Sequence, residues 1–520
     1  MDRPIVTVVQ GKLQGIFEEN VLGSHYLSFK GIPFAAPPVD ELRFKDPEPP
    51  APWEGIRDAS RNAGDVCTQL ELFGALSSQT VIGSEDCLYL NIYIPYNIYQ
   101  TTGNSVMVWI HGGAYLEGNG NDTHYRPDYL MAKDIILISV NYRLGALGFL
   151  NLDHKVASGN QGLKDQIAAL KWIKENIEAF GGDPNNVTVF GASAGGSSTH
   201  FLMLSPLSKG LFQKAILQSG ISTCDWAIIN HSDTNAFKLA SILGVDSKDP
   251  KKVIEFLRTV PAAKIEARII FIPFGPTIDD KAERPVLPYP ISQLLDDDNN
   301  IPIMVGNTSH EYIFFLKDTS QETLNTMYAN IPRYIEYFIN SQNSVKIMQL
   351  TDRVKQYFHN KPFTEESIPS IIRWLSDIHF KIPIKNFVNK RRKKTQISTY
   401  FYEFSYVGSQ ITPTKFMLRN NINNFTTIGA SHIDDLTYLF YLPKCKVDDP
   451  ESPTIGTEDR KVLEILTRMW TNFAKTGNPT PILDQYVTTT WLPATEDAFN
   501  CLNIGDTLQL EIITDHDSMS

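Results

Sequence analysis

The chain has 520 residues, 42% of them hydrophobic, which is enough to bury a large core. Its 47 basic and 58 acidic residues give a net charge of −11, which argues against nucleic acid or an anionic membrane surface as the main partner. No apolar run approaches the length of a membrane helix, and the first residues lack the pattern of a signal peptide, so we expect a soluble protein with no integral membrane segment.

The cellular compartment follows less directly from the sequence. As written, the chain predicts a cytoplasmic location, and the alternative is a secreted protein whose signal peptide is absent from this chain. Five Asn-x-Ser/Thr triplets would suit secretion, although such triplets arise readily by chance in an Asn-rich chain. Their asparagines are Asn121, Asn186, Asn230, Asn307 and Asn424.

The five cysteines are too few for a disulfide scaffold, and they form no Cys-x-x-Cys or His/Cys cluster typical of a metal site. Cys67 and Cys87 are the only close pair. If oxidised, they would close a loop of about 20 residues and contribute roughly 3 kcal/mol in the chain-entropy model. A reduced pair in a cytosolic protein is the alternative.

Strand-like apolar runs alternate with helical segments along the chain. The clearest helix spans residues 163–180, in which apolar residues recur every three or four positions before Gly181 and Gly182 end it. The alternation predicts a mostly parallel sheet with helices on both faces and a ligand site beyond the carboxyl ends of the strands. No linker or repeat interrupts it, so we expect one domain over residues 1–520 with long insertions. The strand-like runs are residues 106–110, 135–142, 187–190, 215–218, 301–306 and 399–404.

A single basic run, residues 390–394, lies just before the last of these strands. A localisation signal or a phosphate-binding patch can have such a composition, but the position favours a solvated helix end or loop. The run therefore gives no reason to expect a nucleic-acid partner.

Residues 191–195 read Gly-Ala-Ser-Ala-Gly, with a β-rich run before them and a helix-like run after them. This is the strand–turn–helix setting of a nucleophile elbow, in which a sharp turn holds a serine hydroxyl exposed beside a base. Gly191 and Gly195 are then required because side chains there would collide where strand and helix approach. The motif predicts Ser193 as a nucleophile, although a plain Gly/Ser turn also matches it.

A second motif, residues 111–115 (His-Gly-Gly-Ala-Tyr), follows the strand-like run 106–110. The tetrahedral intermediate of acyl transfer has an oxyanion, and small residues let backbone N–H groups approach it. We expect the amides of Gly113 and Ala114, joined by that of Ala194, to form an oxyanion hole. An ordinary glycine turn is the alternative.

In an α/β-hydrolase an acid and then a histidine base follow the serine along the chain. Glu311 comes shortly after the run 301–306 and would orient the imidazole and stabilise its charged form. His432 follows later in the chain and is the expected general base. Asp434 and Asp435, within three residues of His432, are alternative acids, although a role in stabilising its loop is favoured.

Three other histidines are weaker candidates for the base. His310 directly precedes the acid, and neighbours on extended chain point to opposite sides, so Glu311 cannot easily orient it. His111 lies in the predicted oxyanion loop, and His200 lies on the helix after the serine. Neither occupies the late loop that the order requires.

These motifs together resemble the type-B carboxylesterase and cholinesterase family over almost the whole chain, and most of all its insect carboxylesterases. Three further segments match that family in the right order: residues 29–38 (FKGIPFAAPP), 85–91 (EDCLYLN) and 141–145 (NYRLG). The resemblance implies an α/β-hydrolase fold with a large, mostly parallel sheet. It also implies the triad of Ser193, Glu311 and His432 and the oxyanion hole of Gly113, Ala114 and Ala194.

The resemblance has implications beyond the triad. It implies a disulfide between Cys67 and Cys87 and places a family serine, Ser219, near the acid. It also implies an active-site gorge lined partly by aromatic residues, for which plain core packing is the alternative. Those aromatic residues are Trp226, Phe314 and Phe315.

Departures from the family pattern narrow the expected substrate. Ala192 stands where most active members have Glu, so a negative charge beside the reacting centre is missing, which disfavours cationic substrates. The segment between Cys67 and Cys87 lacks the tryptophan with which cholinesterases hold a quaternary ammonium. Tyr312 and Ala114 stand where glycine is commoner, and both can alter rate or pocket shape.

The predicted function is therefore a serine carboxylesterase that hydrolyses neutral, apolar carboxylic esters of xenobiotic, pheromone-like or lipid-derived kind through an acyl-enzyme. Organophosphates are expected to phosphorylate Ser193, and no metal or organic cofactor is implied. We expect a monomer or a weak homodimer. The alternatives are a catalytically silent family member that serves as a binding or adhesion protein, and a lipase.

Overall fold

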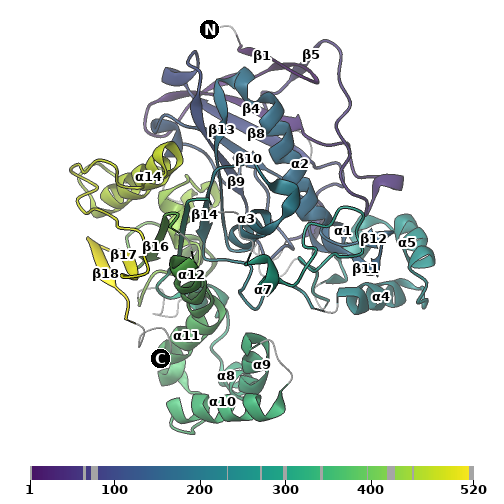
Figure 1. The fold of residues 1–520 in the computed structure, drawn as a ribbon, viewed down its shortest axis with the longest axis vertical. Coiled ribbons are helices and arrows are strands. Elements are labelled where there is room, and N and C mark those ends of the chain that lie inside the picture. Colours follow the sequence, from purple (N-terminus) through teal and green to yellow (C-terminus); the bar gives the residue numbers. More distant parts are fainter. Residues whose placement is uncertain are drawn as a thin grey trace.

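The computed structural model describes residues 3–62, 66–71, 80–230, 232–269, 272–296, 301–339, 343–394, 396–418, 428–447 and 450–514. Within these residues the largest sheet has 11 strands in the order β18-β17-β16-β15-β14-β13-β9-β10-β8-β4-β3 (Figure 1). The seven strands from β17 to β10 in this order run parallel to one another, and antiparallel strands complete both edges of the sheet. The expected mostly parallel sheet is confirmed, and each of the six strand-like runs forms one of its strands.

The strands of this sheet are β3 (Ile16–Glu19), β4 (His25–Pro33), β8 (Tyr89–Pro95), β9 (Asn104–Ile110), β10 (Ile136–Val140), β13 (Gly182–Ala192), β14 (Lys214–Gln218), β15 (Ile303–Thr308), β16 (Thr399–Phe404), β17 (Asn500–Ile504) and β18 (Leu508–Ile512). Three smaller sheets pair β1 (Ile5–Val8) with β2 (Gly11–Gln14) and β5 (Ile56–Asp58), β6 (Gln69–Leu70) with β7 (Val81–Ile82), and β11 (Asn151–His154) with β12 (Ala157–Ser158).

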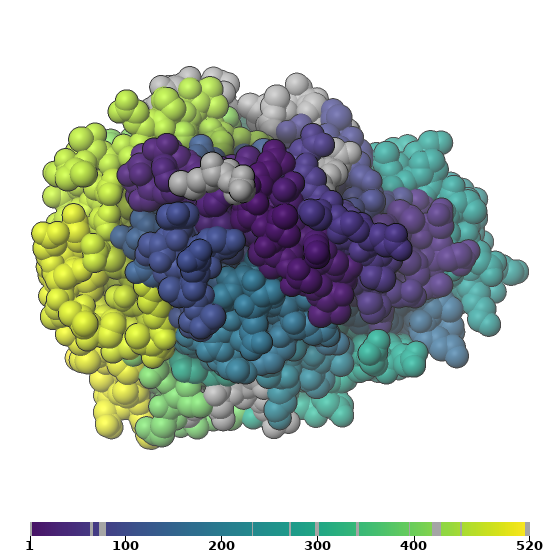
Figure 2. Space-filling model, turned by 90° about the horizontal axis from the view of Figure 1, so that it is seen from above, coloured from purple at the N-terminus to yellow at the C-terminus, as the bar shows by residue number. Residues whose placement is uncertain are grey.

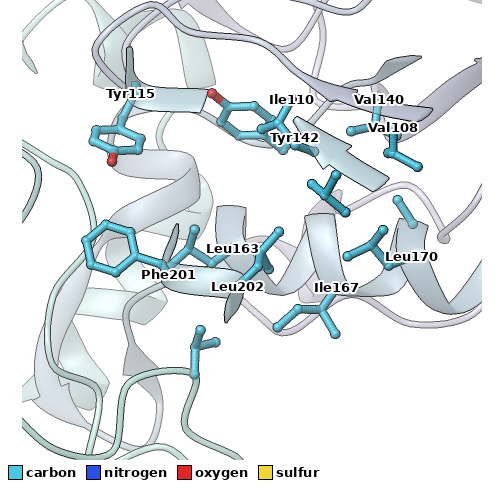
Figure 3. Packing of buried hydrophobic residues seen from close by; sticks show 14 of the residues in the cluster. Val108, Ile110, Tyr115, Val140, Tyr142, Leu163, Ile167, Leu170, Phe201 and Leu202 are labelled. Carbon is cyan, nitrogen blue, oxygen red and sulfur yellow. The ribbon is translucent and has the colours of Figure 1, made fainter. Parts of the chain in front are cut away.

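The two faces of the large sheet pack against separate helices because successive side chains of a strand point to opposite sides. On β9, Val108 belongs to the core under α2 (Gln161–Asn176) and α3 (Ala194–Leu204), whereas Trp109 belongs to the core under α14 (Glu458–Thr476). Figure 3 shows the first core, with side chains of α2 and α3 beneath those of β9 and β10. Each such buried aliphatic side chain contributes roughly 1.5–3 kcal/mol.

The predicted helix over residues 163–180 corresponds to α2 followed by a 3-10 turn, Ile177–Phe180. Its apolar positions, including Leu163 and Ile167, are buried against the sheet. Gly181 ends it with φ 82°, a left-handed conformation in which glycine is favoured.

The remaining helices lie around the sheet. Helices α8 to α11 share a third apolar cluster and lie at the lower end of Figure 1. Seen from above in Figure 2, the purple N-terminal residues cover the middle of one face and the yellow C-terminal residues its left side. The helices not named above are α1 (Gly145–Phe149), α4 (Ser232–Leu243), α5 (Pro250–Thr259), α6 (Ala262–Glu266), α7 (Ile291–Leu294), α8 (Gln321–Ala329), α9 (Ile331–Ile339), α10 (Ser344–Tyr357), α11 (Ile368–Ser376), α12 (Ile382–Lys394) and α13 (Pro413–Leu418).

The basic run 390–394 forms the end of α12, as expected, but it is not solvated throughout. Arg391 and Arg392 are buried. Arg391 donates to the carbonyl of Ile301 over 2.7 Å, and Arg392 donates to the carbonyl of Thr495 over 2.8 Å. The two guanidinium groups therefore fasten the helix end to neighbouring loops rather than facing solvent.

Cys67 and Cys87 form a disulfide, as the resemblance implied. Of the triplet asparagines, Asn307 is fully buried, so its side chain is not reachable in the folded protein, and Asn424 lies outside the described residues. No described helix combines the length and the apolar character needed to cross a bilayer.

Candidate active site

Ser193 stands at a sharp turn between β13 and α3, with φ 59° and ψ −126°. A residue other than glycine is strained at positive φ by roughly 1–3 kcal/mol, and such strain concentrates at functional sites. Its own N–H donates to the carbonyl of Gln218 on the neighbouring strand over 2.8 Å. From residue 187 to residue 205, Ser193 is the one position that is not buried. The turn thus presents a single side chain from an otherwise buried segment.

The glycines of this turn are required by close backbone contacts. A Cβ on Gly191 would lie 2.5 Å from the carbonyl of Gly195, and a Cβ on Gly195 would lie 2.0 Å from the carbonyl oxygen of Ile110. Both distances are too short for any side chain. The steric role predicted for these two glycines is confirmed.

The loop after β9 lies directly beside Ser193, since a Cβ on Gly112 would come within 3.1 Å of the serine Cβ. Gly113, Ala114 and Tyr115 all have positive φ, at 113°, 55° and 62°. Among the described residues, no acceptor takes the N–H of Gly113 or Ala114. Ala194 is the first residue of α3, where an N–H has no partner within the helix. These amides are available as donors next to the serine.

Tyr115 anchors this loop. Its hydroxyl hydrogen-bonds with the Ser197 hydroxyl on α3, and its carbonyl accepts from the Gly145 N–H over 2.8 Å. Its buried ring packs edge-on against Phe149, with 5.3 Å between centroids. The loop that holds the free amides is thereby fixed to the helix that follows Ser193.

Glu311 follows β15 and forms a buried pair with His432. Its Oε2 accepts from His432 Nδ1 over 2.5 Å, and its Oε1 accepts from the Thr308 N–H over 2.8 Å. The side chain of His432 is 2% exposed and that of Glu311 is fully buried. Nε2 of His432 has no partner among the described residues. With Nδ1–H donated to the carboxylate, Nε2 keeps a lone pair that can accept a proton.

Two hydrogen bonds hold the loop of the histidine against the loop of the acid. The His310 N–H donates to the carbonyl of Ala430 over 2.8 Å, and the Ala430 N–H donates to the Ser309 hydroxyl over 3.0 Å. These bonds join segments far apart in the chain, which explains how the acid and the base meet.

The alternative acids, Asp434 and Asp435, bind other groups. Asp434 accepts from the Ser431 N–H over 2.9 Å, and Asp435 accepts from the Gln218 side-chain amide over 2.8 Å. Burial raises the pKa of each carboxyl to about 6. Both therefore stabilise the loop, the role that the sequence favoured.

The three competing histidines have structural contacts. His111 donates to the Gly112 carbonyl and stacks on Tyr142 at 4.3 Å, and burial lowers its pKa to about 4. His200 accepts from the Ser222 N–H over 3.0 Å, and burial lowers its pKa to about 3. His310 contacts the Ser309 hydroxyl over 3.0 Å.

Aromatic rings surround His432. The centroids of Phe314 and Phe315 lie 5.6 and 5.3 Å from that of the imidazole, and Phe315 is 40% exposed. Trp226 contacts Phe380, whose ring centroid lies 4.9 Å from that of the imidazole. Phe380 was not predicted. It lies on a π-helical turn, Asp377–Lys381, a backbone feature for which the sequence offers no signal.

The model of the carboxylesterase family matches residues 2–519. The chain belongs to the carboxylesterase family. It is 34% identical to Esterase E4 of Myzus persicae over 98% of this chain and 91% of that protein. It is 35% identical to a juvenile hormone esterase of Tribolium castaneum over 92% of this chain and 84% of that protein.

A solved structure of a juvenile hormone esterase agrees with this family assignment. The juvenile hormone esterase of Manduca sexta, with OTFP covalently attached, superimposes on this esterase with a TM-score of 0.87 at 28% identity, covering 99% of this chain and 98% of that one. The α/β-hydrolase fold predicted from the sequence is confirmed.

The structure shows the surroundings of two residues that depart from the family pattern, Ala192 and Tyr312, and of the family serine Ser219. Ala192 is 1% exposed, and its methyl group, which has no charge, packs in the core on the α14 face. Tyr312 donates its N–H to the Ser376 hydroxyl over 3.0 Å and stacks on His379. Ser219 directly follows β14, and its hydroxyl is buried and without a partner among the described residues.

Proposed function

We propose that this esterase acts through Ser193 as nucleophile, His432 as general base and Glu311 as the residue that orients the base. One observation carries the proposal most strongly: a buried imidazole has one nitrogen bonded to a carboxylate and the other unpartnered among the described residues. An imidazole held in this way is the general base of the serine-hydrolase template.

The reaction follows from these roles. Ser193 Oγ attacks the ester carbonyl carbon while its proton passes to His432 Nε2, and a tetrahedral intermediate forms. The amides of Gly113, Ala114 and Ala194 donate to its oxyanion. The carbon–oxygen bond to the alcohol then breaks, and the alcohol leaves with the proton from His432.

The acyl-enzyme that remains is hydrolysed by the same groups. Water attacks the acyl carbon, His432 takes a proton from the water, and the serine is released with that proton as the acid departs. Glu311 holds the imidazole in the tautomer that both steps need and stabilises its charged form. Each oxyanion donor contributes a factor of about 10² to 10³ in turnover.

We further propose that the substrates are neutral, apolar carboxylic esters. The rings of Phe314, Phe315 and Phe380 around His432 suit apolar groups, and Ala192 supplies no anionic partner for a cation. Organophosphates are expected to phosphorylate Ser193, because an activated serine attacks a phosphoryl centre as it does a carbonyl.

Pre-steady-state kinetics with p-nitrophenyl acetate test the proposal. The wild type is expected to release a burst of p-nitrophenol, and Ser193→Ala is expected to give none. Ser24→Ala, at an exposed serine, is the matched control and is expected to keep the burst. A wild type without a burst or turnover would support the silent binding protein instead, and a strong preference for emulsified long-chain esters would support the lipase.

A further inference from the structure

The loop after β14 and the π-helical turn before α12 each place an aromatic ring beside the candidate catalytic residues. Phe380 lies 4.9 Å from the His432 imidazole, and its ring lies 5.6 Å from that of Trp226. A Cβ on Gly220 would lie 2.1 Å from the carbonyl oxygen of Ser193 and 3.1 Å from the ring of Trp226. The two rings therefore form one aromatic wall, Trp226 and Phe380, that extends from the backbone of Ser193 to the imidazole of His432.

The residues that precede the two rings, Asp225 before Trp226 and His379 before Phe380, form a partly buried pair. His379 Nδ1 contacts Asp225 Oδ2 over 2.7 Å, and the side chains are 14% and 6% exposed. A second bond joins the same segments, because Trp226 Nε1–H donates to the carbonyl of His379 over 3.0 Å. The paired residues are 154 positions apart in the chain. Cross-links, rather than local chain geometry, therefore set the spacing of the wall.

His379 is held in place by two tyrosine rings. Tyr312 stacks on it at 5.9 Å with an interplanar angle of 25°, and Tyr334 meets it edge-on at 6.1 Å. Tyr312 directly follows Glu311, so it packs the Asp225–His379 pair against the segment of the acid. Tyr312, which stands where the family usually has glycine, thus helps to hold His379 in place.

We propose that Asp225 and His379 are positioning residues that set the acyl-chain selectivity of this esterase by holding Trp226 and Phe380 at a fixed spacing. The inference rests on the proposed function, because the wall matters only if esters react at Ser193. The two rings offer van der Waals contact to an acyl chain, and a longer chain has more atoms to make that contact than an acetyl group has. Breaking the Asp225–His379 pair is therefore expected to lower kcat/KM more for an ester with a longer acyl chain.

The test compares p-nitrophenyl hexanoate with p-nitrophenyl acetate, with active enzyme counted by fluorophosphonate titration. Asp225→Ala and His379→Ala are each expected to lower the hexanoate-to-acetate ratio of kcat/KM by about tenfold, mainly through a higher KM for hexanoate. The double variant is expected to lower it no further, since paired residues act as one unit.

Three further variants separate positioning from general loss of packing. His379→Asn keeps an N–H donor near the place of Nδ1 and is expected to restore most of the ratio. Trp226→Phe removes the second cross-link, leaves Asp225 and His379 unchanged, and is expected to lower the ratio as well. This variant tests the proposal even if the alanine variants do not fold. Asp296→Ala breaks an exposed pair with Lys390 at 3.1 Å and is expected to leave the ratio unchanged.

An unchanged or raised ratio in both single alanine variants would overturn the proposal, and so would effects that multiply in the double variant. If the wild type neither turns over esters nor reacts with the fluorophosphonate, the proposed function itself fails. Failure of the proposed function can be distinguished from failure of the selectivity proposal, because the first is seen with the wild type alone.

Discussion

His432 has two imidazole nitrogens in opposite situations, one bonded to Glu311 and one unpartnered among the described residues. At the scale of single residues, this asymmetry defines the chemistry. In the proposed reaction, the carboxylate selects the tautomer and the free nitrogen takes the proton. Ser193 is the complementary case, because its strained backbone keeps it accessible while residues 187–205 are otherwise buried. Together they supply a base and a nucleophile that need no cofactor in the proposed reaction.

Glu311→Gln tests the orienting role. A glutamine amide that turns its NH₂ towards Nδ1 favours the tautomer with the proton on Nε2, so kcat is expected to fall by about 10⁴, as an equivalent change does in other serine hydrolases. Asp434→Asn changes a carboxyl group of the neighbouring loop, and its kcat is expected to fall far less. Steady-state turnover of p-nitrophenyl acetate measures kcat for both variants. Equal falls in kcat would show that the orienting role does not belong to Glu311.

At the scale of elements, the site is made by loops that follow neighbouring parallel strands. The apolar runs and the turn residues around them predicted β9, β13 and β15 and the segments after them, because strand pattern and turn chemistry are local properties. The order of nucleophile, acid and base along the chain then pointed to Glu311 and His432.

Contacts between distant segments were not predictable in the same way. Nothing near Phe380 signals the π-helical turn that aims it at His432, and no spacing rule links Asp225 to His379. The burial of Arg391 and Arg392 was missed for the same reason, since each guanidinium donates to a backbone carbonyl of a remote segment. Such partners depend on how the elements pack, which one sequence does not encode in its local pattern.

The elbow itself gives a prediction at this scale. Gly195→Ala places a Cβ 2.0 Å from the carbonyl oxygen of Ile110, so strand β9 and helix α3 must separate. The expected loss of stability is about 4 kcal/mol or more, at the extreme of single substitutions. Gly505→Ala, whose nearest neighbour at 3.0 Å is the movable Ser405 hydroxyl, is the control. Coincident denaturation midpoints in guanidinium chloride would show that the turn tolerates a side chain.

At the scale of the whole molecule, stability is coupled to pH through buried carboxyl groups. Glu266 on α6 is fully buried, its Oε1 accepts from the Leu147 N–H over 3.3 Å, and its Oε2 has no partner among the described residues. Burial raises its pKa from 4.5 to about 8. Because the folded state favours the protonated form, the contribution to stability is fully present below pH 4.5 and is lost as the pH rises to about 8.

Glu266→Gln is expected to remove this dependence, since an amide has the shape of the protonated acid and does not ionise. The free energy of unfolding of the variant should exceed that of the wild type increasingly from pH 5 to pH 8, by on the order of a few kcal/mol at the upper end. Denaturant titrations at a series of pH values measure the difference. A difference that stays constant with pH would show that Glu266 is ionised in the folded protein.

Mass spectrometry after treatment with a fluorophosphonate tests the role of Ser193 most directly. We predict one adduct per chain, located by peptide mapping on Ser193 and absent from Ser193→Ala. A wild type that stays unlabelled, or an adduct that persists in Ser193→Ala, would contradict the assignment of Ser193 as the nucleophile.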